Sequence, residues 1–198
     1  MGKAYSEDER FAKKTALMES ALSLFHESGA KSLSIRELTK RAGISQGGFY
    51  TFWYSKQALL LDVIKYRAKQ KLDLIVPLFE DSLADPRGFL KKHLLSWSLD
   101  MKEKISTKPL YRESFELLRR SSLEDASRIS LIYRDFLKEL SDLWIRNRVV
   151  KSVDLGGLVN LLAAVGVLLT DHIQVDDRYF EDLLEAMITG SLEKYIII

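Results

Sequence analysis

Apolar residues recur at helical spacing along most of the chain. Leu17, Ala21, Leu24 and Phe25 stand at i, i+4, i+7 and i+8, which predicts one apolar stripe along a helix. No segment alternates apolar and polar residues over enough positions to predict a strand. The pattern therefore predicts an all-α protein of about nine helices. They are expected over 13–28, 34–42, 45–52, 55–76, 86–105, 109–120, 124–148, 153–173 and 179–195.

Capping residues mark the starts of several of these helices. Ser34 and Glu37 form an S-x-x-E pattern, which predicts a capping box at the start of the second helix. Gly43 ends that helix, and Ser45 and Ser55 are the expected N-caps of the third and fourth. The first four helices are therefore expected to be separate and closely spaced.

The second and third helices have the pattern of a helix-turn-helix. Both are short, and Gly43 stands where the turn between them needs an unusual backbone conformation. Apolar residues that the two helices would share stand at Leu38, Ala42, Ile44, Phe49 and Phe52. The third helix would then be free to enter a DNA major groove. The alternative is an ordinary corner between two helices of an all-helical domain.

The net charge of +2 hides an uneven distribution. Residues 1–72 carry 13 Lys and Arg against 7 Asp and Glu, whereas residues 73–198 carry 17 against 21. A basic segment within a nearly neutral chain is a candidate surface for a polyanion. A solvated face rich in lysine would give the same counts.

Residues 13–65 resemble the N-terminal domain of the TetR/AcrR family of transcriptional regulators. The residues that carry the resemblance are Ala21-Leu22-Ser23-Leu24-Phe25, Gly29, Ser34-Ile35, Leu38, Ala42-Gly43-Ile44-Ser45, Phe49-Tyr50, Lys56 and Leu59. The chain departs from the family pattern at Thr39, Trp53 and Tyr54, where alanine, phenylalanine and proline are usual. These are core or turn positions, so the departures concern local packing more than DNA binding.

The resemblance implies two domains and a function. Residues 1–65 would form a DNA-binding helix-turn-helix domain with a flexible arm over 1–10, and residues 66–198 a ligand-binding and dimerisation domain. The implied function is that of a ligand-responsive regulator, most often a repressor in this family. It would bind a palindromic operator in double-stranded DNA as a homodimer, and a small-molecule effector would release it.

Several residues of the helix-turn-helix are candidate DNA contacts. Tyr50 and Lys56 match the family positions that contact phosphates, and Lys56 also stands at the positive end of the fourth helix. The Gln46 amide can bond to both N6 and N7 of an adenine, although an exposed glutamine in a first helical turn is nearly as good an explanation. Bare backbone at Gly47 would allow close approach to DNA. The remaining candidates are Arg36, Ser45 and Thr51.

The second half of the chain is compatible with an effector pocket. His93, Trp97 and Met101 stand at i, i+4 and i+8, and Phe115 adds aromatic surface. The alternative for each of these residues is plain core. The helix over 153–173 is apolar nearly all round and rich in glycine and alanine, so it is expected to be buried on more than one side. The resemblance implies that this helix and the last one form the homodimer interface.

Other chemistry is excluded or unsupported. The absence of cysteine excludes disulfides and thiol nucleophiles. There is no motif for catalysis, a cofactor or a metal, and the most apolar run, 155–169, is shorter than the roughly twenty residues of a membrane span. The sequence therefore predicts a cytoplasmic protein that is not an enzyme, with no cofactor. Two rivals remain, a helical scaffold that does not bind DNA and an enzyme that uses the helical pocket.

Overall fold

The computed structural model describes residues 6–29, 33–120, 123–171 and 174–198. Within these ranges lie nine α-helices, one 3₁₀-helix (η1) and one pair of short strands. The α-helices are α1 (Glu7–Ser28), α2 (Ile35–Arg41), α3 (Gln46–Phe49), α4 (Lys56–Asp73), α5 (Pro86–Thr107), α6 (Pro109–Arg120), α7 (Leu123–Arg146), α8 (Leu155–Thr170) and α9 (Asp177–Tyr195). The predicted all-helical fold is confirmed, with the strand pair as an addition.

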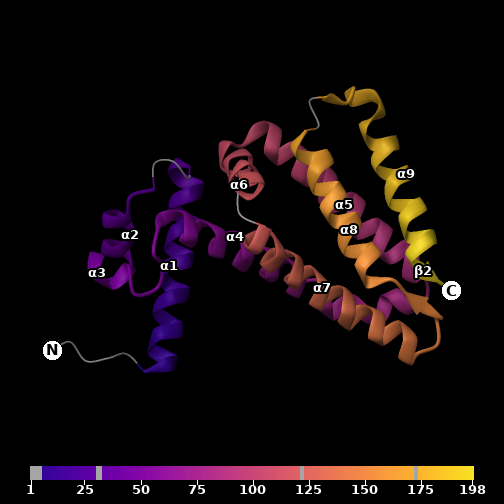
Figure 1. Ribbon diagram of the computed structural model, residues 1–198, viewed down its shortest axis with the longest axis horizontal. Coiled ribbons are helices and arrows are strands. Elements are labelled where there is room, and N and C mark those ends of the chain that lie inside the picture. Colours follow the sequence, from indigo (N-terminus) through magenta and orange to yellow (C-terminus); the bar gives the residue numbers. More distant parts are fainter. Residues whose placement is uncertain (1–5, 30–32, 121–122, 172–173) are drawn as a thin grey trace.

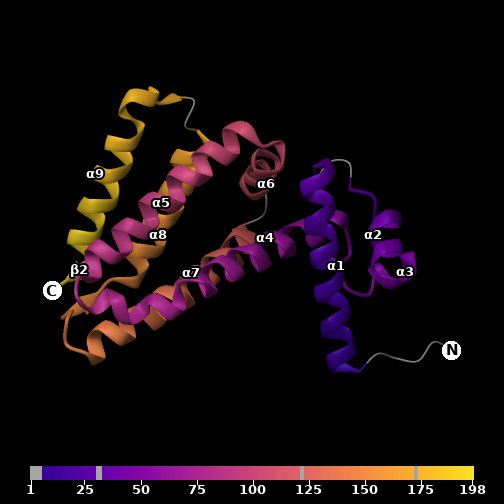
Figure 2. The same cartoon turned by 180° about the vertical axis from the view of Figure 1, so that it is seen from behind.

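The helices form two groups that α4 joins, and α1 and α9 lie far apart, one in each group (Figures 1 and 2). α1, α2, α3 and the first half of α4 enclose one apolar core, which includes Leu17, Leu38, Phe49, Leu59 and Val63. The other helices enclose a second core. The expected boundary between residues 65 and 66 falls inside α4, which continues unbroken across it.

The first helix begins earlier than predicted. Ser6 Oγ accepts a hydrogen bond from the Glu9 backbone N–H at 3.2 Å, and the Glu9 carboxylate accepts one from the Ser6 N–H at 2.9 Å. This capping box, together with acidic residues in the first turn, stabilises the helix start. The prediction of a flexible arm is therefore wrong for residues 7–10, and residues 1–5 lie outside the described part.

The predicted capping box at Ser34 does not form. α2 begins at Ile35, but the Ser34 side chain makes no capping hydrogen bond. The Glu37 carboxylate instead accepts a hydrogen bond from Arg41 at 3.0 Å, so it is turned along the helix and away from its start. The N-caps predicted at Ser45 and Ser55 are confirmed, since their hydroxyls accept from Gly48 and Ala58 respectively.

Two elements were not predicted. β1 (Ser152–Val153) pairs antiparallel with β2 (Ile196–Ile197), and each strand is too short to show an alternating pattern. Arg87 of α5 donates to the Ile196 carbonyl at 2.9 Å and so ties the strand pair to the second core. η1 (Val76–Leu83) follows α4. α3 is also shorter than predicted, because its helical pattern ends at Phe49.

Candidate nucleic-acid interface and ligand cavity

The turn between α2 and α3 depends on a glycine. Gly43 has φ +64°, a conformation that residues with a side chain rarely adopt, as its place in the pattern predicted. On either side of it, Leu38 of α2 and Phe49 of α3 are fully buried. The turn thus holds the two short helices against a common core and leaves the opposite face of α3 in solvent.

That exposed face carries the candidate base-reading residues. Gln46 and Gly47, the first two residues of α3, are exposed. Tyr50 is 58% exposed, and its ring packs edge-on against Phe49 with 5.2 Å between the ring centroids. Ser45 caps the helix, because its Oγ accepts from the Gly48 N–H at 3.1 Å. A capping hydroxyl that accepts this bond still has its proton to donate outward.

The Thr51 side chain is less available for a contact with DNA than the Gln46 side chain is. Its hydroxyl donates to the Gly48 carbonyl at 2.7 Å, and a phosphate would need that same proton. The Thr51 carbonyl in turn accepts from Arg10 of α1 at 2.9 Å. The Arg10 guanidinium also lies over the Phe52 ring, 5.4 Å from its centroid. Arg10 therefore supports the turn after α3 and is not part of a free arm.

The helices that precede and follow α3 in the chain both carry basic residues. Arg36 near the start of α2 and Lys40 one turn later are both exposed. Lys56 is the first residue of α4 and is half-buried, at the positive end of that helix. Exposed or half-buried basic side chains of this kind are suited to contacts with phosphates.

Arg41, in contrast, is committed to an internal contact. Its two terminal nitrogens donate to the two Glu27 carboxylate oxygens at 2.9 and 2.8 Å, and one of them also donates to Glu37. The hydrogen bonds from Arg41 and then from Ser23 lower the pKa of Glu27 to about 2. This bidentate pair links α1 to α2 and fixes the position of the helix-turn-helix on α1.

A polar contact that the sequence did not predict links the turn after α3 to α1 and α4. Trp53 Nε1 donates to the Asp62 carboxylate at 2.9 Å, and Lys14 Nζ pairs with the same oxygen at 2.9 Å. Burial raises the pKa of Asp62, but the bonds from Trp53 and Lys14 outweigh it and the pKa is lowered. We call Trp53, Asp62 and Lys14 the Trp53 latch. The sequence did contain a signal for this contact, because Trp53 stands where the family usually has phenylalanine and only the indole has an N–H to donate.

A cavity of about 510 Å³ lies where the second group of helices meets α1 and α4. Its wall is built from α1, α4, α5, α6, α7 and α8. All four residues proposed for a pocket, His93, Trp97, Met101 and Phe115, line it. The helical spacing brings the first three onto one face of α5, and the tertiary fold brings Phe115 of α6 opposite. The wall is mostly apolar, as small-molecule sites are.

The cationic residues on this wall were not predicted. Arg67 and Lys71 of α4 line the cavity, together with Tyr111 and Tyr133. Burial, and then the charge of Lys92, lowers the pKa of His93, so its imidazole is neutral at pH 7. Arg67 and Lys71 were missed because the candidate pocket residues were taken from the aromatic and apolar positions of later helices.

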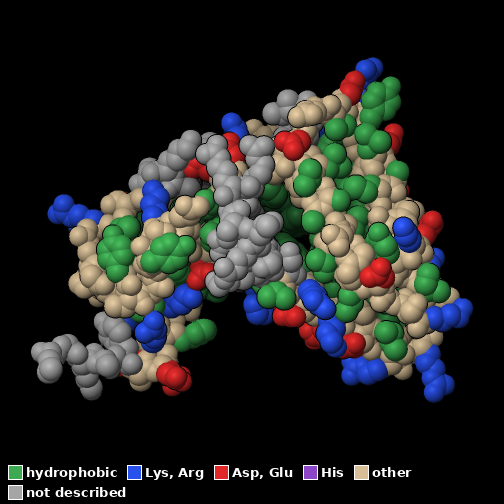
Figure 3. Space-filling view, viewed as in Figure 1, with side chains coloured by type: hydrophobic (Ala, Val, Ile, Leu, Met, Phe, Trp, Pro, Cys, Tyr) green, Lys and Arg blue, Asp and Glu red, His purple; other side chains and the backbone are tan. Residues whose placement is uncertain are grey.

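α8 and α9 present an unpaired face on the outside of the molecule. On α9, Tyr179, Leu183, Ala186 and Gly190 are exposed at i, i+4, i+7 and i+11. On α8, Gly156, Asn160, Ala163 and Val167 are exposed with the same spacing. We call these eight residues the outer face; apolar side chains gather over these helices in Figure 3.

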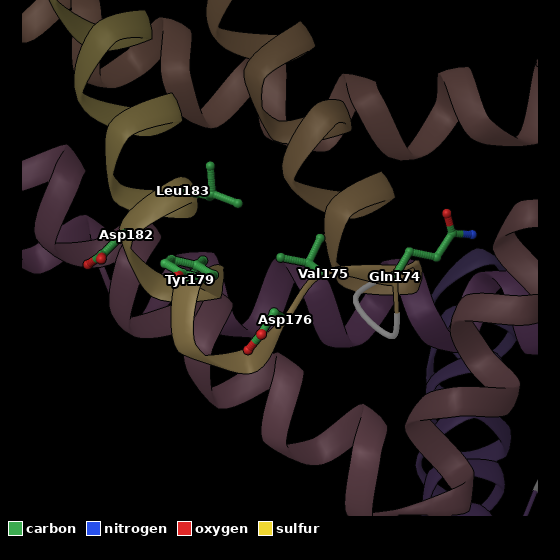
Figure 4. A pocket seen from close by; sticks show the side chains of 6 residues that line it. All are labelled: Gln174, Val175, Asp176, Tyr179, Asp182 and Leu183. Carbon is green, nitrogen blue, oxygen red and sulfur yellow. The ribbon is translucent and has the colours of Figure 1, made fainter.

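The outer face continues into a shallow groove at the start of α9. Figure 4 shows Val175 and Asp176 of the preceding segment on one side of it, and Tyr179 and Leu183 on the other. Within the chain itself α8 packs against α5, α6, α7 and α9, through residues such as Leu161 and Val165. The outer face is the part of α8 that one chain leaves exposed.

Two further expectations concern metals and membranes. The described residues contain no group of three or more His, Asp or Glu side chains arranged to hold a metal ion. His172, which stands close to Asp171, Asp176 and Asp177 in the sequence, lies outside the described residues. No helix in the described ranges is long and apolar enough to span a membrane.

Comparisons with known proteins agree with this architecture. Residues 11–63 match the family "Bacterial regulatory proteins, tetR family". The Bacillus subtilis (strain 168) protein named "Uncharacterized HTH-type transcriptional regulator YuxN" is 43% identical over 54 residues, which cover 27% of this chain and only 19% of that relative. The similarity in sequence is thus concentrated in the helix-turn-helix domain.

Solved structures extend the similarity to the whole fold. A TetR transcriptional regulator from Rhodococcus sp. RHA1 has a TM-score of 0.67 at 14% identity, covering 93% of this chain and 97% of that one. RolR in complex with resorcinol has a TM-score of 0.64 at 16% identity, covering 93% and 90%. The helix-turn-helix domain thus matches the tetR family, and the chain as a whole has the fold of solved TetR regulators.

Proposed function

We propose that this protein is a transcriptional regulator that binds a palindromic DNA operator as a homodimer and is released by a small-molecule effector. In this proposal the DNA-bound protein represses transcription and the effector relieves that repression. The observation that carries the proposal is the exposed face of α3, which Gln46, Gly47 and Tyr50 share, in a helix-turn-helix whose neighbouring helices α2 and α4 carry basic residues. Matched relatives described as transcriptional regulators support the same function.

Each candidate contact has a distinct role in this proposal. Gln46 reads a base edge, while Tyr50 and Lys56 contact phosphates and set the position of α3 in the groove. Arg36 adds a phosphate contact from α2, and the Ser45 hydroxyl can donate to a phosphate while it caps α3. Thr51 has the weakest case, because its proton is used within the turn.

Genomic selection of DNA bound by the full chain, followed by mobility-shift assays, tests this function. Gln46→Ala is expected to lose affinity for the selected operator but not for unrelated DNA, whereas Lys56→Ala weakens both. Lys138→Ala removes a similar charge from an exposed site on α7 and serves as the control. If no genomic fragment is enriched, the protein is a helical scaffold and the proposal fails.

The outer face supports the homodimer. Tyr179 and Leu183 are 57% and 52% exposed, and Val167 is 62% exposed, although all three are large apolar residues on adjacent helices. Small residues between them allow a second pair of helices to approach closely. A two-fold axis through this face would pair α8 and α9 of both subunits and present two copies of α3 to the two halves of a palindrome.

Effector release depends on α4. This one helix begins with Lys56 and further along contributes Arg67, Lys71 and Leu72 to the cavity wall. A ligand that favours one position of α4 therefore changes the spacing of the two helix-turn-helix domains in the dimer. DNA and effector then lower each other's binding affinity by the same factor. Operator affinity that stays equal with and without the true effector would disprove this coupling. Turnover of a metabolite in the cavity would favour an enzyme instead.

A further inference from the structure

The charge on the cavity wall is positive and lies on one helix. Arg67 and Lys71 are spaced i, i+4 on α4, so they stand on the same side of it and both line the cavity. The described lining residues include no Asp or Glu. A site of this kind discriminates between ligands by the sign of their charge.

Lys71 is half-buried and, among the described residues, has no hydrogen-bond or ion-pair partner. The nearby carboxylate, Asp100, is bound to Lys104 at 2.5 Å. Burial and then the charge of Lys104 lower the pKa of Lys71, which Asp100 opposes only in part. An ammonium in such a place gains more from a bound anion than one in open solvent would.

Arg67 adds a second donor beside it. One of its nitrogens donates to the Gln70 side chain at 3.1 Å, which leaves most of its five N–H groups for another partner. The rest of the wall is apolar and aromatic, with Trp97 and Phe115 facing the same space. His93 and Met101 are separated by about 12 Å along α5, so this apolar part of the wall extends well beyond one side chain.

We propose that the cavity binds an acidic amphiphile, a largely apolar molecule with one anionic head group that Lys71 and Arg67 hold. This inference rests on the proposed function, because it names the chemical class of its effector. The bound anion contacts α4 directly, so the charged contact acts on the same helix that begins with Lys56.

Three probes of equal length and different charge test the proposal: decanoate, decan-1-ol and decylammonium. Their binding to the full chain is measured by titration calorimetry below their micelle concentrations. The chain is expected to bind decanoate about tenfold or more tightly than decan-1-ol, the effect of one charge-assisted hydrogen bond, and decylammonium least. Equal affinities for the three, or no binding by any of them, would overturn the proposal.

Two variants locate the head group. Lys71→Met keeps the length of the side chain and should lower decanoate affinity about tenfold while leaving that for decan-1-ol unchanged. Lys69→Met is the matched control, since Lys69 lies on the same helix but is 66% exposed and pairs with Asp73. Arg67→Met provides a second test. If the Lys71 and Arg67 variants both bind decanoate as the wild type does, the assignment is wrong.

The two proposals fail in different ways. Calorimetry requires no DNA, so a preference for decanoate stands even if no operator is found. Conversely, selective operator binding by a protein that shows no preference for the anionic probe would leave the regulator intact and reject only the ligand class.

Discussion

Two glycines of the helix-turn-helix have different physical roles. Gly43 is required by its own backbone, because φ is +64° there. Gly47 has no such conformation, and a Cβ built on it would meet only the Ser45 hydroxyl, at 4.0 Å. The fold therefore accepts a side chain at Gly47, and a requirement for glycine there has to come from something outside the chain.

Gly47→Ala tests that requirement. Because alanine favours helix by about 1 kcal/mol over glycine, the melting temperature should stay the same or rise. Operator affinity should fall at least about tenfold, because the methyl group holds α3 away from the DNA. Gly43→Ala should instead lower stability by about 1–2 kcal/mol. Unchanged operator affinity for Gly47→Ala would remove the close-approach role.

The Glu27–Arg41 pair makes a contribution to stability that depends on pH. The pKa of Glu27 is lowered from 4.5 to about 2, so the contribution is complete above pH 4.5 and is lost as pH falls toward 2. Glu27→Gln should lower the melting temperature at pH 7, and the difference from wild type should shrink as the pH falls through that window. Thermal melts between pH 7 and pH 3 measure it. A difference that does not depend on pH would contradict the ion pair.

At the scale of elements, α4 is the helix on which both sites depend. Its first half packs in the core of the DNA-binding group and its second half lines the cavity. The Trp53 latch attaches the turn after α3 to this helix and to α1. The position of α3 is thus fixed by contacts of the turn and of α4, as well as by its own four residues.

Trp53→Phe should weaken this attachment. It keeps an aromatic ring in a buried position but removes the hydrogen bond to a half-buried carboxylate, which should cost about 1–3 kcal/mol. Denaturant unfolding of Trp53→Phe, Asp62→Asn and the double variant gives the coupling between the two residues. We expect a clear coupling energy, together with a raised Asp62 pKa in Trp53→Phe. If the two changes in unfolding free energy simply add, Trp53 stabilises the protein through packing and not through the hydrogen bond to Asp62.

At the scale of the whole molecule, the cavity and the outer face share part of α8. Ala163 and Val167 line the cavity and are also exposed on the outer face. A ligand that moves this part of α8 would therefore act on both the dimer and, through α4, the DNA-binding heads. The cavity is thus connected to the outer face through α8 and to the DNA-binding group of helices through α4, which joins the two groups in Figure 1.

Leu183→Glu tests the outer face. A charge in the middle of an apolar interface should raise the dimer dissociation constant at least about tenfold and weaken operator binding with it. Ile145→Glu is the control, since Ile145 is similarly exposed, at 46%, but lies on α7. Analytical ultracentrifugation of both variants and the wild type decides the point. A wild type that is monomeric at micromolar concentration would contradict the proposed dimer.

Local sequence signals predicted much of the first group of helices. Ser45, Ser55 and Gly43 act within a few residues of themselves, through a capping hydroxyl or a backbone angle, so their roles can be read without the fold. The prediction of a capping box at Ser34 was wrong for a reason that is nearly as local, because the Glu37 carboxylate accepts a hydrogen bond from Arg41 instead. The start of α1 was missed because its first turns are polar, although its capping box was present in the sequence.

The sequence by itself determined the helical class, the turn at Gly43 and the identity of the face that α3 exposes, because each depends on spacing along one segment. Only the tertiary structure decided what surrounds the cavity. Lys71, Trp97 and Phe115 line the same cavity although they come from three different helices. It also decided that Trp53 bonds Asp62, and that α8 and α9 leave an apolar face uncovered. Contacts between distant segments depend on how whole helices pack, and a single sequence carries no local signal for that.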